Sequence, residues 1–312
     1  VLAPQQIREF WKVIRRSLPK FRQRRIGQDP NRLEILQPQW GPYFQELECG
    51  RECAPAELVS QCHLRQMAMP VLQQEFQCTE LPSLIELEDT LRGTQADRAT
   101  GLDPLPSRIF SQQVVSLAKL YFPLLLKVYL WQQEPISAKG GVMAVLHKRG
   151  PGLLASEYRG IMLLPTISKR IHALLRKRLM FLLSRQKPQG QLGGFAHMEV
   201  PYGSQLLRTF GRIMDSLGIS SAIIFVDLSN AFHKLVRELV SGVHVPQDVE
   251  AVLEQLLHEG IPIDDLIDLL QLPSLMQKLG APPFLIQLLQ DVHTHTWMQV
   301  PGSNIPIITR KG

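Results

Sequence analysis

The sequence predicts an α+β fold, because it combines a long amphipathic helix with short apolar runs. Residues 168–183 place apolar side chains at helical spacing, with lysine and arginine residues between them. Residues 141–146 and 221–228 are short apolar runs bounded by turn residues, and the continuous pattern of the second predicts a buried strand. A chain of 312 residues, 45% of them hydrophobic, can form one large domain or two ordinary ones.

We divide the chain into three parts, residues 1–79, 80–218 and 219–312. The first is a basic N-terminal arm with a helical extension, and the second is a helix-rich region with a small antiparallel sheet. The third begins another sheet, interrupted by a helical insertion. Prolines and a glycine between positions 30 and 42 are expected to break the first part, and Pro123 to kink or break a helix. The other expected elements are helices at 81–91, 106–131 and 204–217, an extended segment at 158–165 and a hairpin at 296–308.

Charge is distributed unevenly along the chain, whose formal net charge is +6 with a pI of about 9.2. Residues 1–32 hold nine lysine or arginine residues and two acids. No acid occurs between Glu157 and Glu199, a stretch with eight basic residues, whereas residues 238–291 hold nine acids and one lysine. The acid-free stretch predicts local contact with a polyanion, and a solvated helix face is the alternative.

Other sequence features exclude or weaken several protein classes. No run of eighteen apolar residues occurs, which argues against a membrane span, and no signal-peptide pattern opens the chain. We therefore expect an intracellular protein of the cytoplasm or nucleus. Four cysteines are too few for a disulfide scaffold; Cys49, Cys53, Cys62 and Cys78 cluster near His63, but their spacing is unlike that of a zinc finger.

A carboxylate stands at the end of the second apolar run. Asp227 precedes a polar turn, where it can hold a hard divalent cation while the following backbone N–H groups meet phosphate oxygens. Phe232, five residues later, can present its ring over the same pocket. The alternative is that Asp227 caps a helix and Phe232 lies in the core.

Two cations flank the turn after the first apolar run. Lys148 follows the strand and Arg159 lies eleven residues later on the expected returning segment, so both can point toward one triphosphate. Arginine offers a bidentate fork and lysine a point charge. Two ordinary surface cations are the alternative.

Four motifs occur in a specific order, and the order is more informative than any one of them. They are Gly101-Leu102-Asp103-Pro104-Leu105-Pro106, then 147–150 (HKRG) with 157–169 (EYRGIMLLPTISK), then 191–195 (QLGGF), then 225–232 (FVDLSNAF). Together, over about residues 80–312, they resemble the reverse transcriptase domain of non-LTR, LINE-like retroelements. The resemblance implies a right-hand polymerase, with fingers at 80–218 and an incomplete palm at 219–312.

The resemblance also implies roles at the nucleotide site. Asp227 is similar to the first metal-binding, catalytic aspartate of the palm, which in the complete enzyme helps to hold two Mg²⁺ ions. Phe232 resembles the aromatic gate that selects deoxynucleotides. Arg159 and Lys148 resemble the fingers residues that hold the β- and γ-phosphates of a dNTP. The residues that would lie beside the incoming triphosphate are Ser229, Asn230 and Ala231.

On the template side, Gln191 and Phe195 match the loop that supports the template, and Lys169 and Arg176 are the expected cations of the template-binding surface. The implied partners are an RNA template, a DNA primer and dNTPs, with no membrane. In the complete protein, a retrotransposon polyprotein, the reaction would be RNA-templated DNA synthesis.

The sequence departs from the family pattern at three points. His233 stands where the family usually has aspartate, and Gly160 replaces a proline after Arg159 and is expected to loosen that strand. No Ala-Asp-Asp sequence occurs, and the pair Asp264-Asp265 comes too early to replace it. We therefore expect a reverse-transcriptase-like fragment that ends before the second catalytic strand and is inactive alone. A non-catalytic RNA- or DNA-binding module, or a retroelement relic, is the alternative.

Overall fold

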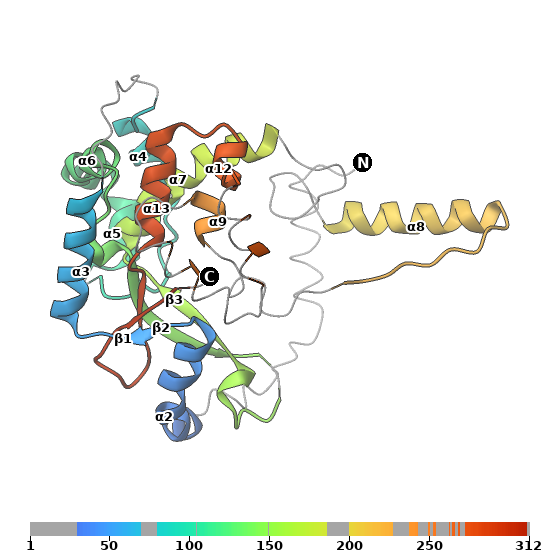
Figure 1. Cartoon of the computed structure of the whole chain (residues 1–312), viewed down its shortest axis with the longest axis horizontal. Helices are drawn as coiled ribbons and strands as arrows, with labels where there is room; N and C mark the ends of the chain where they lie inside the picture. The colour runs from blue at the N-terminus through green and yellow to red at the C-terminus, as the bar shows by residue number, and fades with distance from the viewer. Residues whose placement is uncertain are drawn as a thin grey trace.

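A computed structural model of the chain describes residues 30–69, 80–103, 105–148, 150–185, 200–226, 237–242 and 272–310, with a few single positions between 249 and 268. It confirms the predicted α+β class, with helices packed around one small sheet (Figure 1). The helices are α2 (Pro30–Leu47), α3 (Pro55–Ala68), α4 (Leu84–Arg92), α5 (Ser107–Gln112), α6 (Val114–Trp131), η2 (Ile136–Ala138), η3 (Ala155–Glu157), α7 (Thr166–Arg185), α8 (Val200–Ser216), α9 (Arg237–Ser241), α12 (Leu275–Lys278) and α13 (Pro283–His293). The strands are β1 (Arg51–Glu52), β2 (Gly140–His147), β3 (Tyr158–Leu163), β4 (Trp297–Gln299) and β5 (Ile307–Ile308).

The sheet has the order β1-β5-β4-β2-β3 and joins segments that lie far apart in the sequence. The expected hairpin at 296–308 is confirmed by the antiparallel pairing of β4 with β5, and β2 pairs with β3 in the same way. Within residues 80–218 the pairing is therefore antiparallel, as predicted, whereas the parallel pair of β2 with β4 joins this part to the third part in one sheet instead of a separate one. Parallel pairing requires a long connection, which the helices between β2 and β4 supply.

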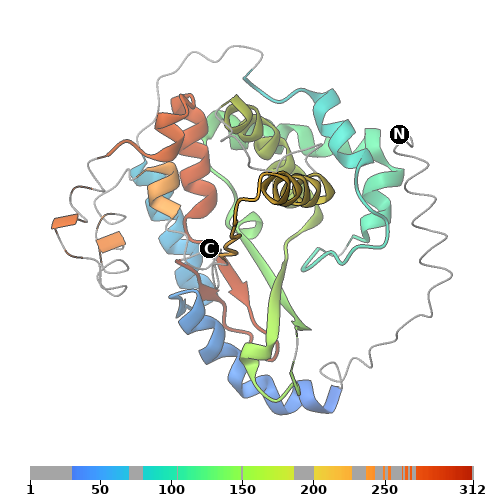
Figure 2. The same cartoon turned by 90° about the vertical axis from the view of Figure 1, so that its right-hand side faces the viewer.

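Helix α2 contradicts the prediction that its prolines and glycine break the chain between positions 30 and 42. The helix runs through Pro38 and Pro42. Leu36, Trp40 and Phe44, spaced by four residues, are buried against the sheet, whereas both prolines lie on the exposed side. Water can hydrogen-bond the carbonyls that the prolines leave free there, and burial of the apolar stripe stabilises the helix. Figure 2 shows α2 along the lower end of the sheet.

The main core is helical and lies beside the sheet. It contains buried residues of α4, α5, α6, α7, α12 and α13. The predicted break within residues 106–131 exists, but it separates α5 from α6 at Gln113 rather than at Pro123. Pro123 lies on the exposed side of α6. At the start of α4 a capping box between Ser83 and Glu86 satisfies the first N–H groups of the helix.

One helix, α6, is long and apolar enough to cross a membrane by length and composition, although it includes Lys119 and Lys127. Core helices meet the same criterion, and 28% of this one is buried. Its buried residues pack in the helical core. The chain is therefore not a clear membrane protein.

Asp291 is the centre of a buried polar cluster that joins α3, α13 and the segment between α6 and β2. Its carboxylate lies 2.8 Å from Lys139 Nζ and 3.8 Å from a guanidinium nitrogen of Arg65. It also accepts hydrogen bonds from the backbone N–H of Glu134, at 2.6 Å, and from the Gln66 amide, at 3.2 and 3.3 Å. The side chains of Asp291 and Lys139 are 0% and 1% exposed. Each charge is therefore stabilised by the other and not by solvent.

The prediction of a buried strand at 221–228 is wrong for the described part of it. Residues 221–226 form no strand, and Ile224, Phe225 and Val226 are 83–85% exposed. A strand needs a hydrogen-bonded neighbour, and none of the described strands pairs with this segment. Helix α8, which precedes it, contains most of the predicted helix 204–217 and ends before Gly218, whose φ is +63°. Figure 1 shows α8 extending away from the body of the molecule.

Candidate nucleic-acid interface

The hairpin of β2 and β3 positions the two predicted phosphate ligands, Lys148 and Arg159. Arg159 pairs with Leu146 across the hairpin, and the backbone N–H of Lys148 donates to Glu157 O at 2.8 Å. Because side chains alternate along paired strands, Lys148 and Arg159 share one face of the hairpin. Both side chains are exposed. The structure therefore places Arg159 on β3 and Lys148 directly after β2, on the same face of the hairpin.

The opposite face of the hairpin is fixed by α2. Tyr158 and Met143 pack with Trp40 and Phe44, and a Cβ at Gly160 would lie 2.9 Å from a Phe44 ring carbon. Glycine at this position therefore allows α2 to pack closely on β3. The close packing of α2 on this face does not test our expectation that Gly160 loosens the strand, which stays a prediction.

The first motif, at 101–106, docks on the end of β3. Gly101 has φ +67°, and a Cβ there would lie 2.1 Å from Leu163 O, so only glycine fits. Asp103 accepts hydrogen bonds from the N–H of Leu105 at 3.0 Å and from the N–H of Thr166, in the first turn of α7, at 3.2 Å. Asp103 thus joins this loop to the start of α7, and the first and second motifs become neighbours.

A cavity of about 480 Å³ lies where these segments meet. Its walls come from β3 and the start of α7 on one side and from the loop after α4 on the other. Ile161 and Leu163, which line it, share the strand face of Arg159 by alternation. The basic residues that line the cavity are Arg98, Lys169 and Arg170.

Two cations of the cavity, Lys169 and Arg170, are incompletely balanced by acids among the described residues. Burial and the nearby positive charges of Arg170 and Arg98 lower the pKa of Lys169, and only Asp103 acts in the opposite direction. Burial also lowers the pKa of Arg170. The Lys169 ammonium donates to Ala99 O at 3.1 Å, and an Arg170 nitrogen donates to Thr90 O at 3.3 Å. Lys169 and Arg170 thus donate these hydrogen bonds to neutral carbonyl groups and not to carboxylates. Cations held in this way can still bind an anionic ligand.

Three further polar atoms support a ligand in this cavity. Thr94 Oγ1, Thr166 Oγ1 and Arg170 Nε are buried, belong to residues that line the cavity and have no hydrogen-bond partner among the described residues. Nearly all buried polar atoms of native proteins are hydrogen-bonded. Their partners must therefore come from beyond the described residues, and a polar ligand in the cavity would satisfy them.

Other cations of the acid-free stretch divide into two kinds. Arg176 is exposed and lies two helical turns after Lys169, on the same face of α7. Arg178 instead turns inward, 3.4 Å from Glu86, with its guanidinium 5.3 Å from the centre of the Tyr129 ring. Arg176 therefore extends the basic surface, whereas Arg178 is part of the packing between helices.

The remaining predicted site residues lie outside the described residues, so their predictions stay predictions. They are Gln191, Phe195, Asp227, Ser229, Asn230, Ala231 and Phe232. Asp227 is the predicted Mg²⁺ ligand, and the structure has no bearing on metal binding there. Across the described ranges, no group of three His, Cys, Asp or Glu side chains is placed to hold a metal ion.

The described cysteines pack as apolar side chains. Cys53 and Cys62 are buried, and burial raises the pKa of both thiols, which favours the protonated form over the thiolate that binds zinc. Cys53 lies in a small cluster with Leu58 and Ile308. Cys78 lies outside the described residues.

Sequence reasoning found Lys169 but missed Arg98, Arg170, Thr94 and Thr166. Arg170 could have been found, since it directly follows Lys169 in the acid-free stretch. Arg98 and Thr94 lie some seventy residues earlier and carry no local pattern, so only the fold brings them to the cavity.

No protein-family model matches the chain, and no curated protein matches it. The likeness to reverse transcriptases therefore depends on the four motifs and their order.

Proposed function

We propose that this chain is part of a reverse transcriptase of a non-LTR retroelement and that it binds an RNA strand along the basic surface of the β2–β3 hairpin and α7. The observation that supports this most directly is the cavity beside β3, lined by Arg98, Lys169 and Arg170 and by residues with three buried polar atoms that have no hydrogen-bond partner in the part of the chain that the structure describes. Such a cavity suits a phosphate and the polar groups next to it.

The proposal assigns a role to each part of the basic surface. Lys169, Arg170 and Arg176 hold template phosphates, and Arg159 with Lys148 holds the triphosphate of a dNTP. In the family, Asp227 would bind Mg²⁺, which supplies charge stabilisation for phosphoryl transfer to a DNA primer. The chain's described residues bind and orient phosphates. An intracellular location, cytoplasmic or nuclear, belongs to the same proposal.

Catalysis by this chain alone is not expected. Its sequence contains no Ala-Asp-Asp, so Asp227 has no partner carboxylate from that motif. Loss of a metal-binding carboxylate removes several kcal/mol of transition-state stabilisation, which corresponds to orders of magnitude in rate. We therefore expect RNA binding without primer extension when the purified chain is supplied with Mg²⁺, primer and dNTPs.

RNA binding is tested by fluorescence anisotropy with a labelled single-stranded RNA between about 0.05 and 0.2 M KCl. The affinity should fall with salt, with a slope of about 0.7 per phosphate contact. Arg98→Ala and Arg170→Ala should each reduce the slope by about one contact. The control is Arg92→Ala, since Arg92 is an exposed arginine that pairs with Glu88 and Asp89. Salt-independent binding, or equal losses in all three variants, would contradict the proposal.

A non-catalytic nucleic-acid-binding module is the second candidate, favoured by the absence of Ala-Asp-Asp. Binding of a dNTP distinguishes the two candidate functions, because only a polymerase needs a nucleotide site. Binding of a fluorescent dATP analogue to the chain with an RNA–DNA primer duplex, lost in Arg159→Ala, would support the reverse transcriptase. Salt-sensitive RNA binding without dNTP binding would support the module.

A further inference from the structure

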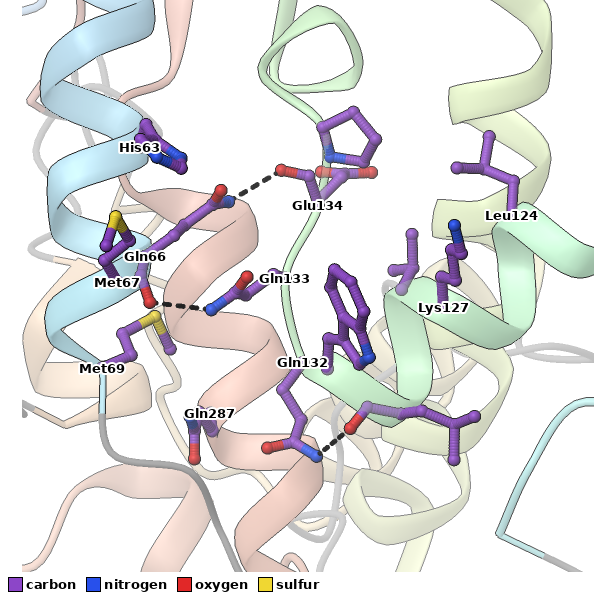
Figure 3. A pocket seen from close by; sticks show the side chains of 14 residues that line it. His63, Gln66, Met67, Met69, Leu124, Lys127, Gln132, Gln133, Glu134 and Gln287 are labelled. Carbon is purple, nitrogen blue, oxygen red and sulfur yellow. Dashed lines mark hydrogen bonds between the residues drawn. The ribbon is translucent and has the colours of Figure 1, made fainter.

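A second cavity lies on another face of the molecule, between α3, α6 and α13 (Figure 3). Its volume is about 640 Å³. Met67 and Met69 of α3 line one side, Leu124 and Trp131 of α6 line the other, and Gln287 of α13 contributes to the lining. None of the predicted reverse transcriptase residues lines it.

Glutamine side chains hold the cavity in shape. The Gln133 amide donates to Gln66 O at 2.8 Å, and the Gln66 amide donates to Glu134 O at 2.9 Å, which ties α3 to the segment after α6. Gln132, in the left-handed conformation with φ +51°, donates from its amide to Leu130 O at 3.0 Å. The helix end that presents Trp131 is therefore fixed before any ligand arrives, which lowers the entropy cost of binding.

The rim of the cavity exposes large apolar side chains. Met67 is 71% exposed, Trp131 64% and Leu130 43%. Tryptophan and methionine are enriched at protein interfaces, where tryptophan is a frequent anchor and methionine adapts to different partners. Apolar side chains gathered around a hollow therefore indicate a surface that another protein covers.

The charged side chains of the described lining are Lys127 and Glu134. Lys127 lines it, with its ammonium 5.8 Å from the centre of the Trp131 ring, and α6 contains two lysines and no acid. Glu134 is the only acid in the lining of the described residues. Its carboxylate is fully buried and lies 2.7 Å from His172 Nε2, so it does not offset Lys127 at the rim.

We propose that this cavity binds an acidic amphipathic helix of a partner protein. Apolar side chains of the helix would enter between Met67 and Trp131, and its carboxylates would face Lys127. The concave shape favours insertion of individual side chains over contact with the flat surface of an anionic membrane, which is the other ligand that an apolar, basic surface can bind.

The test uses a fluorescein-labelled peptide of about 16 residues, with leucines at positions i, i+3, i+4 and i+7 and glutamates at most others. A matched peptide has lysine in place of glutamate. The glutamate peptide should bind at least about tenfold more tightly than the lysine peptide, and Trp131→Ala should weaken its binding by about tenfold or more. Lys127→Glu should remove or reverse the preference for glutamate.

The matched control is Leu120→Ala, since Leu120 is an exposed leucine of α6 that does not line the cavity. This variant should bind the peptide like wild type, and circular dichroism with thermal denaturation shows whether all variants fold. Equal binding of both peptides, or no effect of Trp131→Ala, would overturn the proposal. Binding to phosphatidylserine vesicles that exceeds peptide binding and is lost in Trp131→Ala would replace the partner helix by a membrane. RNA binding is measured separately, so failure here leaves the proposed function intact.

Discussion

Two clusters of charged side chains differ in how their charges are balanced. Around Asp291, Lys139 and Arg65 face a carboxylate that is completely buried, and a backbone N–H and a glutamine amide complete its hydrogen bonds. Beside β3, Lys169 and Arg170 are only partly buried, and the charges that act on Lys169 are the repelling Arg170 and Arg98 and the opposing Asp103.

This difference in charge balance predicts that one cluster stabilises the fold and the other binds a ligand. A buried charge that is fully paired serves to hold elements together, and removing either partner leaves the other unpaired in the interior. A partly buried cation without full compensation weakens the fold slightly and gains most from an anion that arrives from outside. The first cluster should therefore respond to mutation in stability and the second in binding.

The largest effect is expected for Asp291→Ala, which leaves Lys139 without its carboxylate. The free energy of unfolding should fall by about 3–5 kcal/mol, measured by urea denaturation of the whole chain. Asp89→Ala is the control, because Asp89 makes an exposed ion pair with Arg92 at 2.7 Å, and it should cost less than about 1 kcal/mol. Similar losses in the two variants would remove the distinction between the clusters.

A smaller loss of stability is expected for Gly101→Ala. This substitution changes the loop that packs on the end of β3 and leaves the charges of the cavity unchanged. The new Cβ would meet Leu163 O, and alanine is strained at φ +67°, so the cost should be about 2 kcal/mol or more. Gly93→Ala is the control: Gly93 also lines the cavity, but its Cβ would lie 3.4 Å from the nearest atom at φ −72°. Equal stability of the two variants in thermal denaturation would show that the loop can move away from β3.

Lys169→Gln should separate binding from stability. Its RNA affinity at about 0.1 M salt should fall roughly fivefold, the value of one phosphate contact to a single strand. Its unfolding free energy should stay within about 0.5 kcal/mol of wild type, because the lost charge was not compensated. A clear loss of stability with unchanged RNA affinity would make Lys169 a structural residue like Lys139.

The smallest effect concerns pH. Because the pKa of Lys169 in the folded chain lies below its ordinary value of 10.5, the folded state disfavours the charged lysine. This penalty is present below the lowered pKa and disappears as pH rises toward 10.5. Any advantage in stability of Lys169→Gln over wild type should therefore shrink as the pH of the urea denaturation is raised toward 10.5. An advantage that grows with pH would mean that the pKa is raised instead.

Local patterns were sufficient where one segment's own residues decide its structure. The capped helix after Ser83, the long helix α7, the β2–β3 hairpin and the β4–β5 hairpin could all be predicted, because apolar spacing and turn residues are properties of neighbouring positions. Among the candidate site residues, the position of Arg159 on the strand that returns toward Lys148 followed from the same logic.

Tertiary packing decided the rest. Proline predicts a helix break, yet burial of Trp40 and its neighbours keeps α2 helical through two prolines. An apolar run predicts a strand, yet residues 221–226 have no neighbour among the described strands. The cavity beside β3 joins Thr94 and Arg98 to Lys169 and Arg170 across some seventy residues. Sequence spacing determines which side chains share a helix or strand face, whereas the approach of distant segments depends on packing that no local pattern encodes.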